Sequence, residues 1–564
     1  MNMKYILSLI SLLFLNLMPA KAQVAPLKYE TRAVWLTTLN SLDWPKAPAT
    51  SESGREQQKR ELCKILDKYV ELNINTVLLQ TRVRGAVIYP SKIEGWDPCL
   101  TGEPGRNPGY DPLQFAIEEC HKRGMELHCW MVTIPSGNAK VHAQLGNKSV
   151  TKTHPELCRR LKDYYYLDPG HPDTKHYLAS ICKEIVEKYD VDGIHFDFIR
   201  YPENAADAVD KVSYPKYGNG KNKSDWRRDN ITACVREMYN TVKAIKPWVK
   251  VTSAPLGKYR DTSRFSAGGW NAYNAVYQDA KKWMKEGIMD GIFPMLYYRG
   301  DNFYPFILDW AENSNGRTVT AGLGIYFMHS SESKNPWPLA DVKRQMNYSR
   351  LHGVGTAHFR SKFLTDYLKN LYNWCKEDFY ATPSLIEPMT WMKSQKPNTP
   401  TGLTIDQENT FAKLSWNRVP DTSTGTYVTY NVYKSNSNPV DITNPKNLVA
   451  ARLMATEVKI PTPLNADKNA YYAITCCNRF GVESDALQSV VKPQLSKIVY
   501  ESETLHLPEM TGVKEILITD LAERPIFVIA YKPQINLPHL EDGCYIAYAV
   551  GKDGRKKRLG MFIK

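Results

Sequence analysis

The sequence lacks a hydrophobic run long enough to span a membrane. Residues 6–17 form an apolar stretch, but at that length it is too short for a permanent anchor. Lys4 precedes the stretch and an Ala-Lys-Ala motif follows it, which is the pattern of a cleaved signal peptide over residues 1–22. Because Gln23 and not a cysteine follows the predicted cut, we expect an exported protein without a lipid or stable membrane anchor. Its predicted location is the periplasm, the cell surface or the medium.

Several classes of functional motif are also missing. No Gly-rich phosphate loop follows a predicted strand, no cysteine cluster has zinc-site spacing, and no nucleic-acid-binding motif occurs. The sequence therefore predicts no cofactor, no metal and no nucleic-acid partner. The eleven cysteines are an odd number, so at least one is unpaired. The net charge of +14 favours an acidic partner such as an anionic polymer.

What the sequence does contain, over residues 27–380, is a regular alternation of apolar strands and amphipathic helices. The eight predicted strands begin at Arg32, Asn75, Met125, Val191, Val249, Asp290, Thr318 and Gly353. Apolar residues at helical spacing predict helices between them, for example over residues 225–246 and 273–286. Eight strand–helix units favour a (β/α)8 TIM barrel, and a doubly wound open sheet is the alternative.

The composition changes near residue 381. Residues 381–396 are rich in proline and are predicted to form a linker. Residues 397–495 contain short strand patterns separated by turn signals, as in an all-β sandwich, and residues 496–564 are again strand-like. We therefore expect a barrel followed by an all-β sandwich and a small C-terminal β domain.

The fourth predicted strand, "VDGIHFDFIRYP" over residues 191–202, carries charged side chains where it ends. Because side chains alternate along a strand, His195 and Asp197 share one face, and Arg200 follows at the rim. Active sites of such barrels lie at the C-terminal ends of the strands, where an inward carboxylate is costly unless it is paired or used. Asp197 is therefore the first candidate for a catalytic acid, and a structural ion pair is the alternative.

Other strand ends carry aromatic and polar side chains that suit a sugar-binding cleft, since aromatic rings stack on sugar faces and polar groups bind hydroxyls. The predicted substrate-binding residues are Arg84, Trp96, His128, Trp130, His195, Arg200, Tyr297 and His358. A glycosidase also needs a second carboxyl group at the scissile bond. Glu94, Asp301 and Asp43 compete for that role, with Glu94 favoured because it lies beside Trp96.

Ordered blocks such as "RAVWLTTLNSLDWP", "GYDPLQFAIEECHKRGMELHCW", "YDVDGIHFDFIRYP" and "YQDAKKWMKEGIMDGIFPMLYY" extend over residues 29–372. Together they resemble the glycosyl-hydrolase-like family 10 of exported bacterial proteins. The resemblance implies a TIM barrel that cleaves O-glycosidic bonds, with bacterial glycans, including peptidoglycan glycan strands, as substrates. Some members carry a second Asp directly after the strand-four Asp, where this sequence has Phe198. The strand texture of residues 397–491 similarly resembles a fibronectin type III module.

The sequence leaves three functions open. The first is an exported glycoside hydrolase acting on a bacterial polysaccharide, with Asp197 as nucleophile or base. The second is a non-catalytic glycan-binding surface scaffold on an inactive barrel, which the substitution by Phe198 suggests. The third is a metal-dependent deacetylase using His195 and Asp197, although two ligands on one strand are too few for a metal site.

Overall fold

The computed structural model describes residues 24–407, 411–461, 470–489 and 498–564. The predicted signal peptide, residues 1–22, lies outside the described residues. The chain forms two compact units, residues 1–488 and 489–564. Within the described residues, no helix combines the length and the apolar character needed to cross a bilayer.

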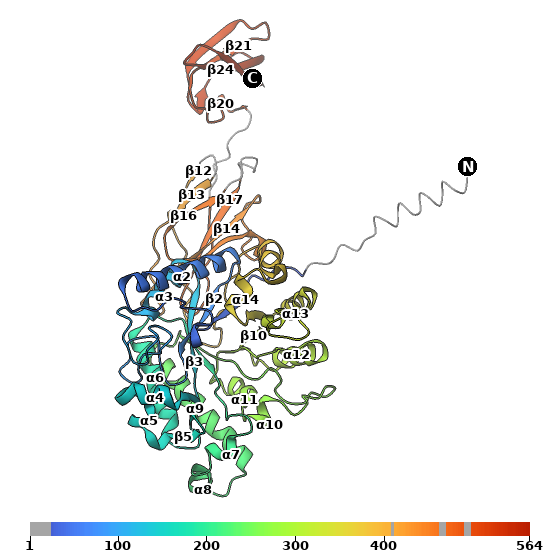
Figure 1. The fold of residues 1–564 in the computed structure, drawn as a ribbon. Helices are drawn as coiled ribbons and strands as arrows, with labels where there is room; N and C mark the ends of the chain where they lie inside the picture. The colour runs from blue at the N-terminus through green and yellow to red at the C-terminus, as the bar shows by residue number, and fades with distance from the viewer. Residues whose placement is uncertain (1–23, 408–410, 462–469, 490–497) are drawn as a thin grey trace, which may run out of the picture. The chain divides into compact units, whose positions relative to one another are not determined.

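The larger unit contains a closed barrel of eight parallel strands (Figure 1). In chain order these are β1 (Arg32–Leu36), β2 (Thr76–Arg82), β3 (Glu126–Val132), β7 (Gly193–Asp197), β8 (Lys250–Ser253), β9 (Gly291–Ile292), β10 (Thr318–Leu323) and β11 (Gly355–His358). The barrel closes where β1 pairs with β11, with Val34 opposite His358. All eight predicted strands are present, and the predicted (β/α)8 fold class is confirmed.

Every residue of β1, β2 and β3 is buried, so both faces of these strands lie inside the protein. One face packs against the surrounding helices, and the other fills the lumen with side chains from several strands. The lumen cluster consists of Ala33, Trp35, Leu78, Trp130, Ala254, Phe293 and Ala357. The lumen is therefore a packed core, and a ligand has access to the barrel only at its ends.

Amphipathic helices surround the strands. The longer ones are α2 (Glu52–Glu71), α3 (Pro112–Lys122), α6 (Thr174–Lys188), α9 (Lys223–Ile245), α12 (Tyr304–Glu312) and α13 (Leu339–Leu351). In α9 the residues Ile231, Val235 and Val242 of the predicted apolar stripe are fully buried, and Ile245 at its end is partly buried. The apolar spacing in the sequence thus identified the face of α9 that packs on the barrel.

The helix predicted over residues 273–286 is broken. The chain forms α10 (Ala272–Ala275) and α11 (Ala280–Lys285) in its place. Tyr277 adopts a left-handed φ of 62° between them, and the Asp279 side chain accepts the N–H of Lys282 as the N-cap of α11. An aspartate that caps a new helix was indistinguishable, by spacing alone, from one within a longer helix.

Residues 404–488 form a β sandwich in the same compact unit. Its two sheets have the orders β12-β13-β16 and β15-β14-β17-β18 and share a core that includes Leu414, Val432 and Ile474. The strands are β12 (Thr404–Gln407), β13 (Phe411–Ser415), β14 (Thr429–Ser435), β15 (Leu448–Leu453), β16 (Glu457–Pro461), β17 (Tyr471–Cys477) and β18 (Leu487–Gln488). The all-β character of this region is confirmed, and its likeness to a fibronectin type III module stays a prediction.

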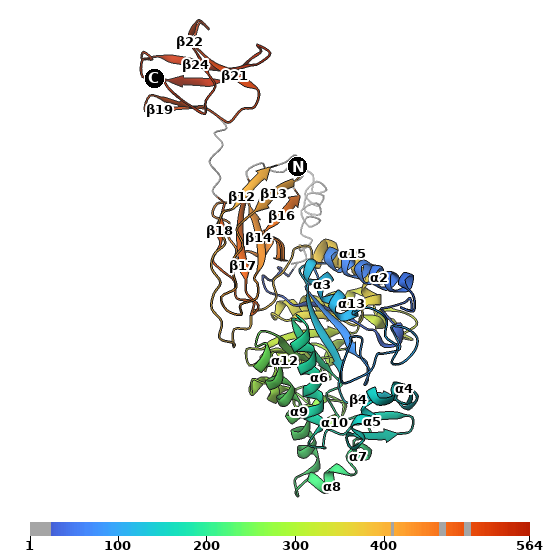
Figure 2. The ribbon, with the colours of Figure 1, turned by 90° about the vertical axis from the view of Figure 1, so that its left-hand side faces the viewer.

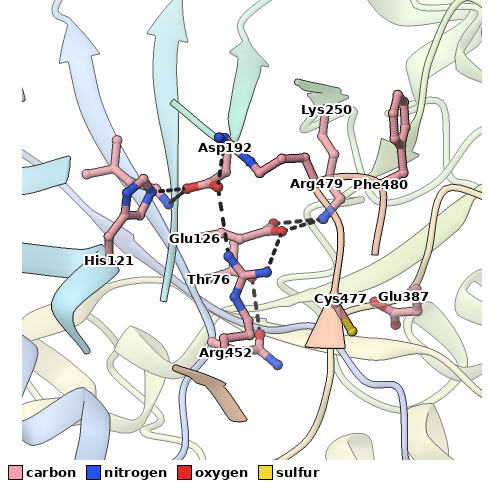
Figure 3. Close-up of polar contacts among 12 residues, drawn as sticks. Thr76, His121, Glu126, Asp192, Lys250, Glu387, Arg452, Cys477, Arg479 and Phe480 are labelled. Carbon is pink, nitrogen blue, oxygen red and sulfur yellow. Dashed lines mark hydrogen bonds and ion pairs between the residues drawn. The ribbon is translucent and has the colours of Figure 1, made fainter. Parts of the chain in front are cut away.

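A buried ion-pair network joins the sandwich to the N-terminal end of the barrel (Figure 3). Arg479 Nη2 lies 3.5 Å from Asp192 Oδ1, and Arg452 Nη1 lies 3.5 Å from Glu126 Oε1. His121 Nε2 lies 2.8 Å from Asp192 Oδ2. Burial by itself would raise the pKa of Asp192, but His121, Arg479 and Arg452 together hold it far below its usual range. The sandwich is therefore docked on the barrel by complementary charge.

The segment predicted to be a linker, residues 381–396, contacts the barrel. Glu387 accepts hydrogen bonds from the backbone N–H of Thr31 at 3.0 Å and from its hydroxyl at 2.5 Å. Trp391 Nε1 donates to Asp290 Oδ1 at 2.9 Å. These contacts tie the segment to the same end of the barrel as the sandwich.

Long insertions lie at the opposite end of the barrel, where the strands have their C-termini (Figure 2). After β3 the chain forms a small antiparallel sheet, with β6 between β4 and β5, and two short helices. These elements are β4 (Pro135–Asn138), α4 (Ala139–Leu145), α5 (Val150–Thr153), β5 (Cys158–Leu161) and β6 (Tyr164–Leu167). After β7 come α7 (Ala206–Val209) and α8 (Ser213–Tyr217). The two insertions supply walls for a cleft at the mouth of the barrel.

The second compact unit has a core of its own. Its sheets have the orders β19-β20-β23 and β22-β21-β24-β25, and Ile516, Ala547 and Phe562 are buried in its core. The strands are β19 (Val499–Glu501), β20 (Thr504–His506), β21 (Val513–Thr519), β22 (Pro525–Ala530), β23 (Gln534–Asn536), β24 (Cys544–Gly551) and β25 (Lys556–Ile563). The predicted β character of the C-terminal region is confirmed.

Candidate active site

Asp197 is the last residue of β7, and its carboxyl group lies at the mouth of the barrel. The residue is 6% exposed. Its Oδ2 accepts a hydrogen bond from Trp130 Nε1 at 3.0 Å, and its Oδ1 accepts the backbone N–H of Phe198 at 2.7 Å. Burial raises the pKa of Asp197, while Arg200, the two N–H donors and Arg84 oppose the rise. The carboxyl group is thus fixed in one orientation by donors that favour its ionised form.

His195 lies one layer deeper on the same face of β7. Its Nε2 accepts a hydrogen bond from Trp35 Nε1 at 3.2 Å, and its Nδ1 lies 2.9 Å from the hydroxyl of Thr252. Burial, and then the charge of His128, lower the pKa of His195 well below its usual value, so the imidazole is neutral. With both ring nitrogens engaged, His195 supports the lumen below Asp197 and does not share a ligand site with it.

The other two predicted histidines do not lie at the mouth. His128 points into the lower lumen, where its Nε2 lies 3.0 Å from Glu126 Oε2. His358 faces away from the lumen, with its Nε2 3.1 Å from the Tyr380 hydroxyl. Ala357 belongs to the lumen cluster, so alternation directs its neighbour His358 toward the helices. Neither histidine is positioned to contact a substrate, in contrast to the prediction.

A cleft of two neighbouring cavities extends along the mouth of the barrel. Asp197 is not among the residues that line either cavity, but Phe198 and Arg200, which follow it in the chain, line the first. The first has a volume of about 230 Å³, and its lining includes Arg84, Tyr164, Tyr166, Phe198, Arg200 and Glu203. The second has a volume of about 390 Å³, and its lining includes Asn40, Arg84, Asp97, Asn138 and Tyr164. Arg84 and Tyr164 line both cavities, so the loop after β2 and strand β6 supply the boundary between them. Aromatic faces beside hydrogen-bonding groups suit the two kinds of surface on a sugar ring.

The predicted aromatic residues Tyr297 and Trp96 line neither cavity, but their surroundings differ. Tyr297 is half-buried and stacks on Phe359 with 5.4 Å between the ring centroids. Burial raises the pKa of Tyr297, and the charge of Asp197 adds to the rise, which places the phenol near the candidate acid. Trp96 instead packs against the main hydrophobic core and lines neither cavity.

Glu94 is enclosed in a buried ion pair. Its two carboxylate oxygens accept hydrogen bonds from Arg82 at 2.7 and 2.8 Å, and the Tyr177 hydroxyl donates to Oε1 at 2.8 Å. The side chains of Glu94 and Arg82 are both fully buried. A general acid must reach the leaving-group oxygen, and Glu94 has no exposed atom with which to do so. Its position therefore supports a structural role in place of the predicted catalytic one.

The other two predicted partner acids also lie apart from the cleft. Asp43 is buried, with its Oδ1 2.5 Å from Arg360 Nη1 and its Oδ2 accepting the N–H of Thr37 at 3.1 Å. Asp301 is exposed on the loop after β9 and lines neither cavity. Asp43 ties β1 to the loop after β11, and Asp301 has the environment of a solvated surface acid.

Asp97 is a cleft carboxyl group that the sequence predictions did not include. It is 6% exposed, lines the second cavity, and accepts the backbone N–H of Cys99 through Oδ1 at 2.8 Å. Burial raises its pKa to about 6, against the opposing effects of the Cys99 donor and Arg84. Its position directly after Trp96, in the loop that follows β2, was the available signal, but sequence gave no measure of its burial.

Among the described residues, no group of three or more His, Cys, Asp or Glu side chains is arranged to hold a metal ion. All eleven cysteines are free thiols. The polar side chains that line the cleft include carboxyl, guanidinium, phenol and amide groups.

Comparison with known proteins identifies the family. Residues 30–326, more than half of the chain, match the family model Glycosyl hydrolase-like 10. Glycosyl hydrolase YngK of Bacillus subtilis (strain 168) is 29% identical over 514 residues, which cover 87% of this chain and 98% of the relative. Glycosyl hydrolase DigH of Escherichia coli (strain K12) is 37% identical over 366 residues, which cover 59% of this chain and 83% of the relative.

Among solved structures, the glycoside hydrolase domain of PgaB (BpsB) from Bordetella bronchiseptica is 15% identical with a TM-score of 0.42. That match covers 62% of this chain and 98% of the PgaB domain. The family model and both relatives carry the name of glycosyl hydrolases. The chain belongs to the glycosyl hydrolase-like 10 family.

Proposed function

We propose that this protein is an exported glycosidase that cleaves O-glycosidic bonds in a bacterial polysaccharide, with peptidoglycan glycan strands as the first substrate to test. The observation that carries the proposal is the carboxyl group of Asp197, which two N–H donors hold at the end of β7, directly before the cleft-lining residue Phe198. Family membership supports glycosidase chemistry in general.

The environments of two carboxyl groups support different catalytic roles. Asp197 receives hydrogen bonds on both oxygens from groups that can only donate, which suits a nucleophile or base. Asp97 has a pKa of about 6 because of its burial, which suits a general acid near neutral pH. Pairs of acids whose surroundings differ in this way supply both functions in glycoside hydrolysis. Asp97 is thus the proposed partner of Asp197.

The experiment incubates the mature chain, from Gln23 onward, with peptidoglycan glycan strands freed of their peptides. Mass spectrometry follows new reducing ends for the wild type and for Asp197→Asn, Asp97→Asn and Asp301→Asn. We expect the first two variants to lose about 10²-fold or more of the activity, because each removes a proton-transfer or nucleophilic group. Asp301→Asn makes the same chemical change on an exposed acid outside the cleft and should retain activity.

Three results would count against these assignments. Full activity of Asp197→Asn would remove the assigned role of that residue. Loss of activity in Asp301→Asn but not in Asp97→Asn would assign the general acid to Asp301, on the loop after β9, in place of Asp97. Retention of the strands without cleavage, across a panel of glycans, would favour the non-catalytic glycan-binding scaffold that Phe198 first suggested.

Export is a separate part of the proposal and has its own test. The apolar stretch over residues 6–17 and the Ala-Lys-Ala motif support cleavage after residue 22. Expression of the full chain in a bacterial host, followed by fractionation and N-terminal sequencing, should give protein outside the cytoplasm that begins at Gln23. Cytoplasmic protein that retains residues 1–22 would contradict export.

A further inference from the structure

The second compact unit, residues 489–564, exposes a large share of the chain's apolar side chains. Among the described residues, six of the thirteen exposed large apolar side chains belong to this small unit, namely Val499, Leu521, Ile526, Val528, Met561 and Ile563. Single exposed apolar residues are ordinary on a protein surface, but a group of them on a small domain marks an interaction site. The strands of this unit show which of them lie together.

Three of these side chains share one face of the sheet β22-β21-β24-β25. Val528 of β22 pairs with Leu517 of β21, which lies between two core residues of its strand and so faces away from the core. Met561 and Ile563 of β25 stand on either side of Phe562, which is a core residue. All of these apolar side chains except Phe562 therefore belong to the face of the sheet that is turned away from the core of the unit, which we call the outer face.

The outer face also carries cations. Residues 551–564 contain a single acid, Asp553, and the basic residues Lys552, Arg555, Lys556, Lys557, Arg558 and Lys564. Tyr548 pairs with Leu517 on one side and with Arg558 on the other, so Arg558 lies on the outer face, and Lys556 shares that face by alternation. Lys556, Lys557 and Arg558 are exposed, and within the described residues none of them forms an ion pair. Uncompensated cations and apolar side chains thus lie on one surface.

Simpler explanations account for only part of this surface. Strand β25 is at the edge of its sheet, and basic side chains on an edge strand hinder pairing with other chains. That role explains the cations but not Met561 and Ile563, which are 55% and 72% exposed and favour association. A second copy of the chain would cover the apolar side chains, but it would also enclose unpaired cations of both chains, which is unfavourable. A partner that is anionic at its surface and apolar beneath it satisfies both kinds of side chain.

We propose that the outer face of the C-terminal unit binds an anionic lipid surface. Met561 and Ile563 enter the boundary between headgroups and acyl chains, and the cations of residues 556–558 contact the lipid phosphates. Each Lys or Arg close to such a surface strengthens binding about fivefold, so three of them strengthen it about 10²-fold. The inference does not depend on the glycosidase proposal. It gives the C-terminal unit a function of its own, which is to hold the chain at a membrane surface without a covalent lipid.

The test is sedimentation of the full mature chain with lipid vesicles. One set of vesicles contains phosphatidylcholine alone, and in the other set a third of the phosphatidylcholine is replaced by phosphatidylglycerol. In dilute buffer we expect the anionic vesicles to bind the chain about 10²-fold more tightly than the neutral ones. Added salt should reduce this preference, because it screens the attraction between the cations and the phosphates.

Two multiple variants test whether the outer face is responsible. The triple variant Lys556→Gln, Lys557→Gln, Arg558→Gln should lose the preference for anionic vesicles. The double variant Met561→Ser, Ile563→Ser should keep the preference but bind the anionic vesicles about tenfold more weakly, because it loses buried apolar area. The matched controls change exposed residues of the larger unit in the same way and should bind like the wild type, namely Arg60→Gln, Lys64→Gln, Lys334→Gln and Val70→Ser, Leu351→Ser. Thermal unfolding of each variant confirms that it is folded.

Equal binding to neutral and anionic vesicles, or equal losses in the variants and their controls, would overturn the inference. Dimers that light scattering detects in the wild type but not in Met561→Ser, Ile563→Ser would assign the outer face to a second copy of the chain. Binding to a soluble anionic polymer as tightly as to the anionic vesicles, unchanged in the same double variant, would assign the cations to a polymer. Either of these last two results would also refute a lipid surface as the partner.

Discussion

Glu94 and Asp97 are three residues apart in one loop, and both are buried, yet their surroundings differ. Glu94 has a full partner in Arg82, so its charge is compensated inside the protein. Asp97 has a single N–H donor on Oδ1 and faces a cavity. The sequence predicted both acids near the mouth of the barrel because both follow β2. It did not show that Arg82 and Tyr177, which come from other elements, bind Glu94 and leave Asp97 without an ion-pair partner among the described residues.

The buried ion pair between Glu94 and Arg82 should contribute to the stability of the fold. Glu94→Gln leaves the Arg82 guanidinium buried without a counter-charge, so we expect a loss of about 3–5 kcal/mol in the free energy of unfolding. Urea denaturation followed by circular dichroism measures it. Glu103→Gln is the control, because Glu103 pairs with Arg106 on the surface and should change stability by less than about 0.5 kcal/mol. Equal stability of the two variants would contradict the structural role of Glu94.

For Asp97 we expect the opposite effect, because removing its carboxylate should raise the free energy of unfolding, by an amount that depends on pH. Its folded pKa of about 6 exceeds the unfolded value of about 3.9, so the folded state binds the proton more tightly and loses relative stability as pH rises through this interval. Asp97→Asn removes the buried charge. We expect it to raise the free energy of unfolding at pH 7 by about 1–3 kcal/mol and to have little effect at pH 4. Urea denaturation at both pH values checks this, and destabilisation at pH 7 would contradict it.

The residues of the site were only partly predictable. Asp197 and Arg200 could be placed because strand alternation and the barrel rule together locate the C-terminal end of β7. His358 was wrongly predicted to face the lumen. Alternate residues of β11 face inward, but the sequence does not show which of the two alternating sets does so.

At the scale of elements, the barrel strands were predictable because most of them contain several apolar residues and are buried on both faces. The small sheet after β3 was not, because β4, β5 and β6 have only four residues each and most positions of β5 and β6 are only partly buried. Three consecutive tyrosines, Tyr164, Tyr165 and Tyr166, stand in β6, so the sequence shows no alternation of apolar and polar residues from which their orientation could be predicted. Pairing of β6 with β4 and β5 determines that Tyr164 and Tyr166 face the cleft.

This alternation in β6 predicts that neighbouring tyrosines have different functions. Tyr164→Ala removes an aromatic surface shared by both cavities, and we expect binding of the glycan to weaken about tenfold, in line with about 1–2 kcal/mol for a lost aromatic contact. Tyr165→Ala is the matched control, since Tyr165 contacts His142 and lines neither cavity. Calorimetric titration measures both, and similar losses in the two variants would refute the assigned orientation of β6.

At the scale of the whole molecule, the sequence divided the chain into modules but did not show how the modules join. The prolines of residues 381–396 predicted a linker, whereas Glu387 and Trp391 bind the barrel. Arg479 and Asp192 are nearly 300 residues apart, so no local pattern relates them. The docking contacts nevertheless use ordinary charge pairing (Figure 3). The insertions that supply cleft residues lie at the opposite end of the barrel (Figure 2).

The docking network makes the final prediction. Arg479→Met removes a buried cation from Asp192 and Asp190, and we expect the free energy of unfolding to fall by about 3–5 kcal/mol at pH 7. The folded pKa of Asp192 is depressed, so its contribution is complete above the unfolded pKa of about 3.9 and declines as pH falls further. The difference between wild type and variant should therefore be the same at pH 7 and pH 5 and smaller at pH 3. Urea denaturation at these three pH values, with the exposed Arg524→Met as control, measures it. A constant difference at all three would show that packing of the arginine, and not its charge, holds the sandwich on the barrel.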